Sequence, residues 1–418
     1  MPADTTQRLG NAVAAASETQ TLTSVSVAHL VSHFYMMVLP VLMPLLKERL
    51  GVSFLDIGFA LTAFSVVTGL TQAPMGFLVD RIGARPILVS GLVLGGLSFL
   101  SLAFVTTYPW LVAVALIAGL ANCVYHPADY AMLTDGISEH RMGRAFSVHT
   151  FAAFVGNAVA PAILLALAGF GGLQAALISA GLMGPATAVL FLLPSAQASS
   201  SRSHAARLVR AATEPAGQSL ASVLTPTVLA LTGFFSLLAL ANAAVFNFTV
   251  VALIAAQQMS FAAANVALTA YLGCTAIGVL IGGALADRSR RHGHVTAIGF
   301  GLSAIVMLPI AVASLSAPAV VLAMGFSGII FGLVQPARDM LVRRAAPPGS
   351  AGRVFGIVST GFNIGGIVGP VLFGWLMDHG EPRWVFGAAA AFMAMTAIFG
   401  VFEERRGRSG DRPGPGRC

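Results

Sequence analysis

Long apolar runs dominate this sequence and constrain its fold more than any other feature. A helix rises about 1.5 Å per residue, so roughly 20 apolar residues cross the ~30 Å core of a bilayer. Hydrophobic residues make up 56% of the chain and charged residues only 9%, a balance that a soluble domain could not bury. The sequence therefore predicts an all-α membrane protein with twelve transmembrane helices. They are expected at residues 25–46, 55–79, 86–106, 109–133, 145–168, 171–194, 226–251, 261–286, 295–314, 317–342, 354–377 and 383–402.

The basic residues predict how these spans are oriented. If both ends of the chain lie inside, all of the 23 basic residues except Lys47, Arg49 and Arg383 fall on the cytoplasmic side. This bias follows the positive-inside rule. It predicts a multi-pass plasma membrane protein of the bacterial inner membrane type, with both termini cytoplasmic. Because the basic clusters lie between apolar runs, the net charge of +7 does not indicate nucleic-acid binding. We see no leader of the cleaved type, so the first span is expected to insert itself.

An internal repeat predicts two related halves. Residues 126–161 align without a gap to 335–370, so that His126-Pro127-Ala128 meets Gln335-Pro336-Ala337. Two six-helix bundles in parallel orientation, with a solute site between them, are a recurring transporter plan. We expect these bundles at 25–194 and 223–402.

Three polar segments flank the bundles. Residues 1–24 are expected to form a cytoplasmic N-terminal tail. Residues 195–222 are Ser/Ala-rich and basic, which is typical of a cytoplasmic linker. Residues 403–418 are charged and rich in Gly and Pro, which predicts a disordered cytoplasmic tail.

Two copies of a short loop motif carry a family resemblance. The first is Gly76-x-Leu78-x-Asp80-Arg81-x-Gly83-x-Arg85, and the second is Gly283-x-Leu285-x-Asp287-Arg288. Both fall on predicted cytoplasmic loops at half-chain spacing, and on these residues the chain resembles the major facilitator superfamily. Ala84 departs from the motif, since the family usually has a basic residue there. The stretches SHFYMMVLPVLMPLL and HPADY resemble the fosmidomycin-resistance, drug-efflux-like branch more weakly, and favour efflux.

The resemblance implies a cytoplasmic gate. Asp80 would meet Arg353 at the start of span 11, and Asp287 would meet Arg144 at the start of span 5. The alternative is that these charges only mark the inner side of the membrane. Arg338, the repeat partner of Asp129, could pair with it across the axis or attract anionic solutes. The predicted gate residues are Asp80, Arg81, Arg85, Arg144, Asp287, Arg288, Arg338 and Arg353.

Small residues in spans 5 and 11 are assigned to helix packing or hinge motion. Span 5 carries Gly156-x-x-x-Ala160-Pro161, a degenerate form of the family's antiporter motif. Span 11 has the fuller copy, with Gly365, Gly369 and Pro370. Because small residues let membrane helices approach closely in any bundle, packing is favoured over solute contact for Gly156, Pro161, Gly365, Gly369 and Pro370.

Ionisable residues inside the membrane are the best candidates for coupling, because each costs several kcal/mol unless paired or hydrated. His29 and His33 share one face of span 1, and His126 and Asp129 share one face of span 4. His149 also lies within a span. Counted from the predicted cytoplasmic edge, His29 and Asp129 are each about 6–7 Å deep, and His33 and His126 about 12 Å. The two pairs are therefore expected to face each other and to bind or relay a proton; hydrogen-bonded structural histidines and a metal site are the alternatives.

Polar residues on the spans that line the family's cavity complete the candidate site. Together with the histidines and Asp129, the proton-coupling or substrate cavity is expected to include Tyr35, Asn242, Asn247 and Gln335. No central carboxylate pair or arginine pair is visible in the sequence, which favours a weakly charged or amphipathic solute over a dianion.

The sequence thus predicts a secondary active transporter of a small organic solute, coupled to protons, with efflux favoured. Proton-coupled uptake of a small organic acid or vitamin-like molecule is the alternative, and a non-transporting membrane receptor a lower one. The chain lacks a Walker phosphate loop and a nucleophile–base constellation, so neither ATP-driven transport nor an enzyme is expected. We expect no cofactor and no resident metal, and a functional monomer.

Overall fold

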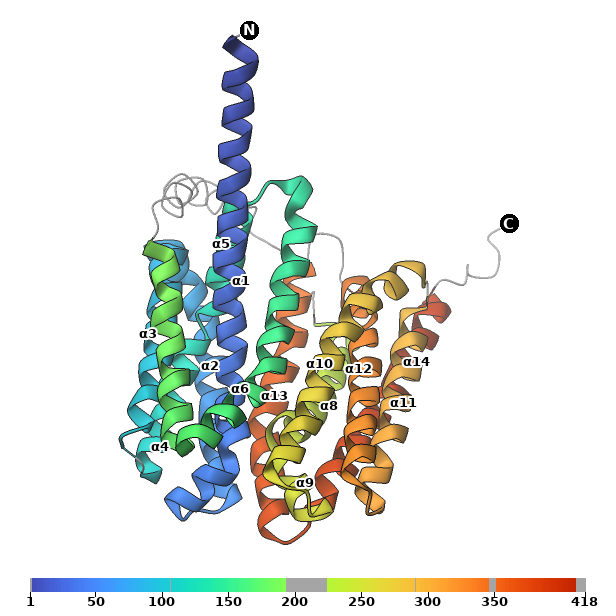
Figure 1. The fold of residues 1–418 in the computed structure, drawn as a ribbon. Coiled ribbons are helices and arrows are strands. Elements are labelled where there is room, and N and C mark those ends of the chain that lie inside the picture. Colours follow the sequence, from blue (N-terminus) through green and yellow to red (C-terminus); the bar gives the residue numbers. More distant parts are fainter. Residues whose placement is uncertain (1, 106, 193–223, 290, 346–350, 411–418) are drawn as a thin grey trace, which may run out of the picture. The chain divides into compact units, whose positions relative to one another are not determined.

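The computed structural model describes residues 2–105, 107–192, 224–289, 291–345 and 351–410, and every element within them is helical (Figure 1). The chain divides into two compact units. Unit 1 comprises Met1–Val52 and Phe59–Gly217, and unit 2 comprises Ser53–Gly58 and Gln218–Cys418. The predicted linker, 195–222, and the last part of the predicted tail, 411–418, lie outside the described residues.

Unit 1 is built from the helices that precede the linker. They are α1 (Pro2–Leu50), α2 (Phe54–Ile82), α3 (Ala84–Leu102), α4 (Tyr108–Asn122), α5 (Tyr125–Gly136), α6 (Glu139–Ala188) and the short helix η1 (Val189–Leu192). α4 and α5 form one apolar span interrupted near Cys123. Pro127 accounts for this break, because it has no N–H to donate to the Cys123 carbonyl and its ring crowds that group.

Unit 2 contains the helices after the linker. They are α8 (Pro226–Ala243), the π-helical turn η4 (Ala244–Phe248), α9 (Thr249–Gln257), α10 (Phe261–Arg288), α11 (His292–Val312), α12 (Ala317–Ala345), α13 (Ala351–Asp378) and α14 (Arg383–Gly410). The segment Ser53–Gly58 belongs to this unit. There the Asp378 carboxylate accepts the backbone N–H groups of Phe54 and Leu55 at 2.9 and 2.7 Å and so caps the start of α2.

The described helices account for the predicted number of spans. Eleven of them are long and apolar enough to cross a membrane. One, Glu139–Leu192, has 54 residues, which is about 80 Å of helix and more than twice the length a bilayer core requires. Its backbone leaves helical geometry at Gly171 and Gly172, where Gly172 adopts φ 66°. The two sides of this break match the separate spans expected at 145–168 and 171–194, and the twelve-helix fold is confirmed.

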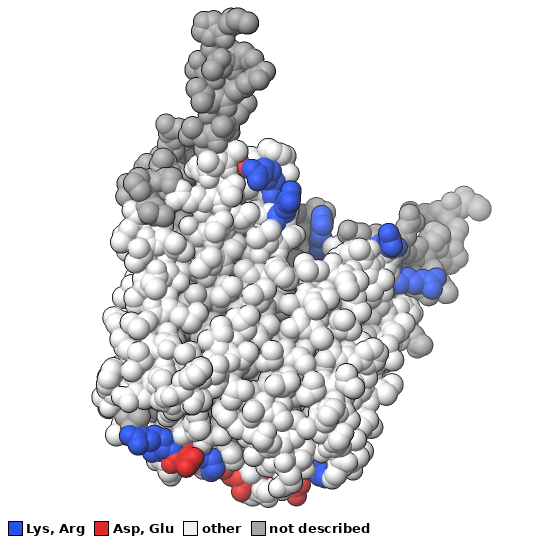
Figure 2. Space-filling view, in the orientation of Figure 1, with Lys and Arg blue, Asp and Glu red and all other residues white. Residues whose placement is uncertain are grey.

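The surface composition fits a lipid environment. Large apolar side chains are exposed along the helices, among them Phe77, Phe170 and Leu322. Water would penalise so much exposed apolar surface, whereas hydrocarbon does not. In the view of Figure 2, charged side chains lie at the helix ends of each unit and the middle of each unit is free of them. The protein is a multi-pass membrane protein.

Both chain ends are more helical than their composition indicates. α1 begins at Pro2, so the predicted tail 1–24 and the first span form one continuous helix. α14 continues to Gly410. The expectation of disorder from residue 403 is therefore wrong over 403–410. Residues such as Glu and Arg, common in this stretch, are good helix formers, and a preceding helix removes the cost of nucleation.

The same type of glycine contact occurs inside each of the two units, at repeat-related positions. A Cβ on Gly156 of α6 would lie 2.2 Å from the Leu30 carbonyl oxygen of α1. A Cβ on Gly365 of α13 would lie 2.3 Å from the Ala239 Cβ of α8. Gly156 and Gly365 are repeat partners, and Leu30 and Ala239 have the same spacing in sequence. Each unit therefore packs its fifth span on its first through a glycine, because no side chain fits there.

Candidate functional site

A cluster of titratable side chains lies inside unit 1, where α1, α5 and α6 meet. α1 contributes His29 and His33, and α5 contributes His126 and Asp129. α6 contributes His149. The spacings of four and three residues place each pair on one helix face, as the sequence predicts.

Asp129 is the centre of this cluster and is completely buried. Its Oδ2 lies 3.0 Å from Nδ1 of His29 and 3.8 Å from Nε2 of His149. These contacts lack hydrogen-bond geometry, so they are ion pairs when a histidine is protonated and unpaired buried contacts when it is not. An isolated buried charge is costly. The protonation state of Asp129 therefore depends on the protonation states of His29 and His149.

The histidines form a continuous set of ring contacts around Asp129. The rings of His29 and His149 stack with centroids 3.8 Å apart. His33 and His126 approach His29 edge-on, at 4.8 and 5.3 Å. His29 and His149 are buried, His33 is partly exposed and His126 is exposed on the surface of unit 1. The cluster thus leads from a buried carboxylate to the surface of its unit.

Asn157 fixes one end of this set. Its Nδ2 lies 3.2 Å from Nδ1 of His33, within hydrogen-bond distance. Asn157 follows Gly156, the residue that lets α6 approach α1, and a Cβ on Gly156 would also touch the His33 Cβ at 3.2 Å. The close helix packing therefore positions the histidine ring.

His149 is the member of the cluster that sequence reasoning left out of the candidate site. The sequence places His149 inside a span, but residue spacing does not group it with the other four residues. The missing signal was depth. His149 lies four residues from the predicted edge of its span at 145, just as His29 lies four residues from the edge at 25. The same argument that matched His29 with Asp129 would have included it.

Tyr35 does not join the cluster. Its hydroxyl accepts the backbone N–H of Gly184 at 2.7 Å, and its ring packs against Phe99 in the core of unit 1. The residue is buried. Its contacts are those of a structural tyrosine that ties α1 to α3 and α6.

The remaining predicted cavity residues lie in unit 2. Asn242 lies just before the π-helical turn η4 and Asn247 lies within it, and both are partly buried. Gln335 on α12 is buried. The rings of Phe246 and Tyr271 contact each other at 6.2 Å beside the turn. A π turn widens the helix and re-aims its side chains, and such turns are frequent at functional sites, but no residue pattern predicts this one.

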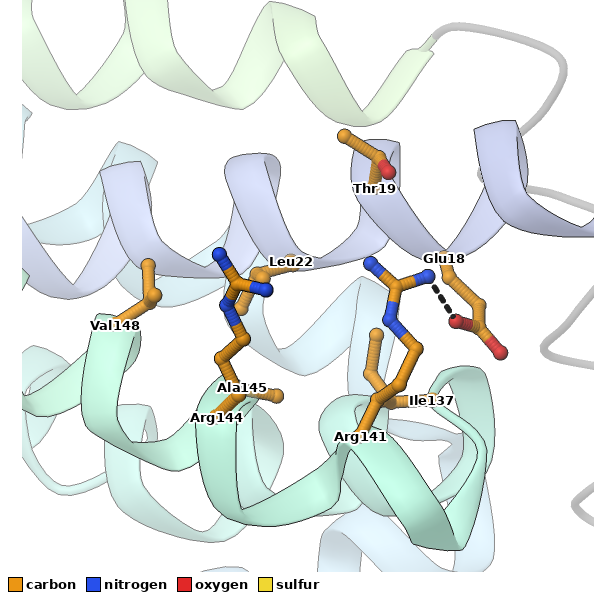
Figure 3. A pocket seen from close by; sticks show the side chains of 8 residues that line it. All are labelled: Glu18, Thr19, Leu22, Ile137, Arg141, Arg144, Ala145 and Val148. Atoms are coloured by element: carbon orange, nitrogen blue, oxygen red, sulfur yellow. Dashed lines mark hydrogen bonds and ion pairs between the residues drawn. The ribbon is translucent and has the colours of Figure 1, made fainter.

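The predicted gate residues stay a prediction. Asp80 and Arg81 lie near the exposed end of α2, Arg85 at the start of α3, and Arg288 at the end of α10. The side chains of Asp287 and Arg353, which two gate contacts require, lie outside the described residues. Arg144 lines a pocket within unit 1 (Figure 3).

Arg338 is engaged within unit 2. Its guanidinium donates to Asp339 Oδ1 at 2.7 Å, and its Cζ lies 5.1 Å from the Phe235 ring centre and 5.7 Å from that of Phe362. These are an ion pair and two cation–π contacts.

The residues assigned to packing have packing contacts. Gly365 and Gly369 of α13 meet Ala239 and Ala243 of α8, with a Cβ at 2.3 and 2.4 Å respectively. Pro161 and Pro370 are buried inside α6 and α13.

The donor set of the cluster would also suit a metal. The ligand atoms of His29, Asp129 and His149 lie within 4.8 Å of one another. Imidazole and carboxylate together bind divalent transition metals. A proton and a metal are therefore the two cations to be distinguished by experiment.

Comparison with known proteins points to one family. A model described as Major Facilitator Superfamily matches residues 25–254 and 232–417. The "Multidrug resistance protein MdtH" of Aeromonas hydrophila subsp. hydrophila is 28% identical over 359 residues, covering 81% of this chain and 84% of that protein. The protein of the same name from Enterobacter sp. (strain 638) is 26% identical over 392 residues, covering 90% and 92%.

Solved structures share the fold. A bacterial homolog of the human lysosomal transporter Spinster, in an inward-facing and occupied conformation, superposes with a TM-score of 0.74 at 14% identity, covering 94% of this chain and 98% of that one. The unoccupied inward-facing form gives a TM-score of 0.76, covering 96% and 99%. At this identity the likeness extends to the fold alone.

Proposed function

This chain belongs to the Major Facilitator Superfamily of transporters, and we propose from that premise that it exports a small organic solute in exchange for protons. The observation that carries the proposal is the buried contact of Asp129 with His29 and His149. A carboxylate held among histidines can take up and release a proton near neutral pH, because imidazole titrates there and each charge tunes the other.

In this proposal the cluster forms a proton path from the exposed His126 to the buried Asp129. His126 is exposed on unit 1, its ring lies 5.3 Å from that of His29, and His29 contacts Asp129. The groups facing Asp129 are His29 from α1, His149 from α6 and Tyr125 from α5. In this proposal a proton enters through His126 and His29 and is held between Asp129 and its two histidines.

Alternating access follows from the change in charge. With Asp129 ionised and a histidine protonated, the buried pair is held together by a strong attraction in a low-dielectric site. When an added proton neutralises Asp129, that attraction is lost and the contact of α5 with α1 and α6 weakens. Two states of one packed site, biased by a proton, are what coupling requires.

Two other observations support the proposed solute class and the proposed direction of transport. The MdtH proteins, which this chain resembles over most of its length, are described as multidrug resistance proteins. Unit 2 offers the amides Asn242 and Asn247 and the Phe246–Tyr271 ring pair. Neutral amides and aromatic rings suit a weakly charged, amphipathic molecule.

The test uses everted membrane vesicles that hold a proton gradient reported by a fluorescent weak base. Addition of an exported amphipathic dye such as ethidium should partly collapse the gradient in vesicles with the wild-type chain. Asp129→Asn should reduce this response to that of empty vesicles, because an amide cannot carry the proton. Glu381→Gln, which removes an exposed carboxylate of unit 2, is the control and should keep the response.

The other outcomes identify the alternatives. A response only with solutes added to right-side-out vesicles would mean uptake instead of export. Loss of activity on adding a chelator, restored by zinc, would make the cluster a metal site. An unchanged response in Asp129→Asn would sink the assignment of the cluster to coupling.

The orientation is part of the same proposal: both termini face the cytoplasm of a bacterial inner membrane, and the monomer is the working unit. Cys418 is the terminal residue, whereas Cys123 is buried and Cys274 partly buried inside spans. A membrane-impermeant maleimide should therefore label Cys418 in everted vesicles and not in intact cells. Labelling in intact cells would reverse the orientation.

A further inference from the structure

A pocket of about 250 Å³ opens within unit 1 between α1 and the start of α6 (Figure 3). Its apolar wall includes Leu22 of α1, Ile137 and Val148, and its polar rim includes Glu18, Arg141 and Arg144. The pocket has no part in the histidine cluster. It is a site with an apolar wall and a basic rim.

The wall of the pocket is the surface of a packed core. Val25, Leu133, Ile137 and Ala145 are buried together, and Leu22 packs against them. Val148 is exposed beside this core. The pocket therefore presents a continuous apolar surface that water wets poorly and a hydrocarbon chain can cover.

Among the described residues that line the pocket, the rim holds two arginines and one carboxylate. Arg141 donates to Glu18 Oε2 at 2.7 Å, and the other oxygen of Glu18 accepts the backbone N–H of Ser138 at 3.1 Å. Glu18 is thus committed to Arg141 and to the start of α6. Arg144 makes no ion pair among the residues that the structure describes, and it lies along α1 beside Leu22 (Figure 3). In Figure 2, Lys and Arg side chains lie at both ends of the helices, and one group is at the end where α6 begins.

We propose that this pocket binds an anionic phospholipid, with the phosphate on Arg144 and Arg141 and an acyl chain over Leu22, Ile137 and Val148. The arginine-rich end of the unit is the one that the charge distribution predicts to be cytoplasmic, at the level of the lipid head groups. Basic pockets between membrane helices on that side recognise such head groups, and a guanidinium fits a phosphate bidentately.

Charge makes the chain's own linker a poor occupant. Residues 195–222 contain Arg202, Arg207 and Arg210 against one acidic residue, Glu214, so the linker is basic. A basic segment would be repelled by the same rim. A lipid combines the two features that the pocket requires, an apolar chain and a negative head, in one molecule.

Lipid retention by the purified full-length chain tests the proposal without any transport measurement, so its outcome is independent of the proposed function. In native mass spectrometry, phosphatidylglycerol should be retained in preference to phosphatidylcholine with the same acyl chains. Arg144→Gln should weaken phosphatidylglycerol retention about fivefold, the effect expected for one basic contact at a membrane surface. Val148→Glu, which places a carboxylate in the pocket, should weaken it at least as much.

Arg81→Gln, an exposed arginine at the end of α2 outside the pocket, is the control and should keep the wild-type retention. An equal loss in Arg81→Gln, or equal retention of the two lipids, would show general surface attraction and overturn the proposal. Displacement of the lipid by millimolar glycerol 3-phosphate would also overturn it, since it would indicate a site for a soluble phosphate.

Discussion

In unit 1, the positions of His29, Asp129 and His149 bring three titratable side chains into contact. In unit 2, the repeat offset places Leu238, Arg338 and Val358 at the corresponding positions. Leu238 and Val358 are fully buried. The glycines that pack the fifth span on the first are present in both units.

The difference shows that two constraints act separately on the repeat. Helix packing retains Gly156 and Gly365 in both units, because the close approach of the backbones requires it. Among the described residues, the cluster of a carboxylate and histidines is found in unit 1 alone, since packing does not need it. Where unit 1 has a carboxylate among histidines, unit 2 has Arg338 bound to Asp339 and stacked on two phenylalanines. We therefore assign proton binding to one unit and packing to both.

Exchange of the central residues should have the largest effect. Asp129→Arg places the residue of unit 2 in a fully buried site beside two histidines, where it has no counter-ion. We expect the free energy of unfolding to fall by about 3–5 kcal/mol, the usual cost of an uncompensated buried charge. Heating of the detergent-purified protein, followed by size exclusion, measures this loss. If Asp129→Arg unfolded with the same free energy as the wild type, this expectation would be wrong, and the site would have to be hydrated.

The shared packing can be tested next. Gly156→Ala and Gly365→Ala should each lower the free energy of unfolding by about 1–3 kcal/mol, because the added methyl groups meet the neighbouring helix below contact distance. Gly143→Ala, where a Cβ meets nothing within 4 Å, is the control and should be neutral or slightly stabilising. The same thermal assay ranks the three. A loss in only one unit would contradict a common packing plan.

Several of these features could be predicted from the sequence, and the reasons are physical. The length of the apolar runs determines the spans, although the break at Gly171–Gly172 falls just inside the span expected to begin at 171. Residue spacing and depth place His29 and Asp129 at one level. Each of these features depends on local periodicity, which a single sequence displays.

Other features depend on contacts that local periodicity does not encode. The hydroxyl of Tyr35, a residue expected in the cavity, accepts the Gly184 N–H, and this contact joins two helices far apart in sequence. The π turn at Ala244–Phe248 is a change of hydrogen-bond register with no residue signature. Spacing does not reveal His149, which has no polar neighbour on its own helix face; its depth, four residues from the expected edge at 145, is the sequence signal that links it to the cluster.

A third experiment sharpens the role of His149. His149→Val installs the residue of unit 2 and removes one of the two imidazoles that stabilise an ionised Asp129. The pH at which proton-driven flux is half-maximal should rise, because an ionised Asp129 loses one of the two imidazoles that can carry a compensating charge. Flux measured in proteoliposomes between pH 5 and 9 gives this midpoint. Val358→His is the reciprocal variant in unit 2 and should leave the midpoint unchanged; a shift there would show that titration is not confined to unit 1.

The smallest effect is expected where unit 2 uses its arginine for packing. Phe362→Leu removes one of the two rings that Arg338 faces and keeps most of the apolar volume. The free energy of unfolding should fall by about 0.5–1 kcal/mol, and the pH midpoint of flux should stay at the wild-type value. Thermal unfolding and the same proteoliposome assay provide both readouts. Because Asp339 still binds Arg338 in this variant, a change in the midpoint would mean that the arginine acts in coupling, and the division of labour between the units would fail.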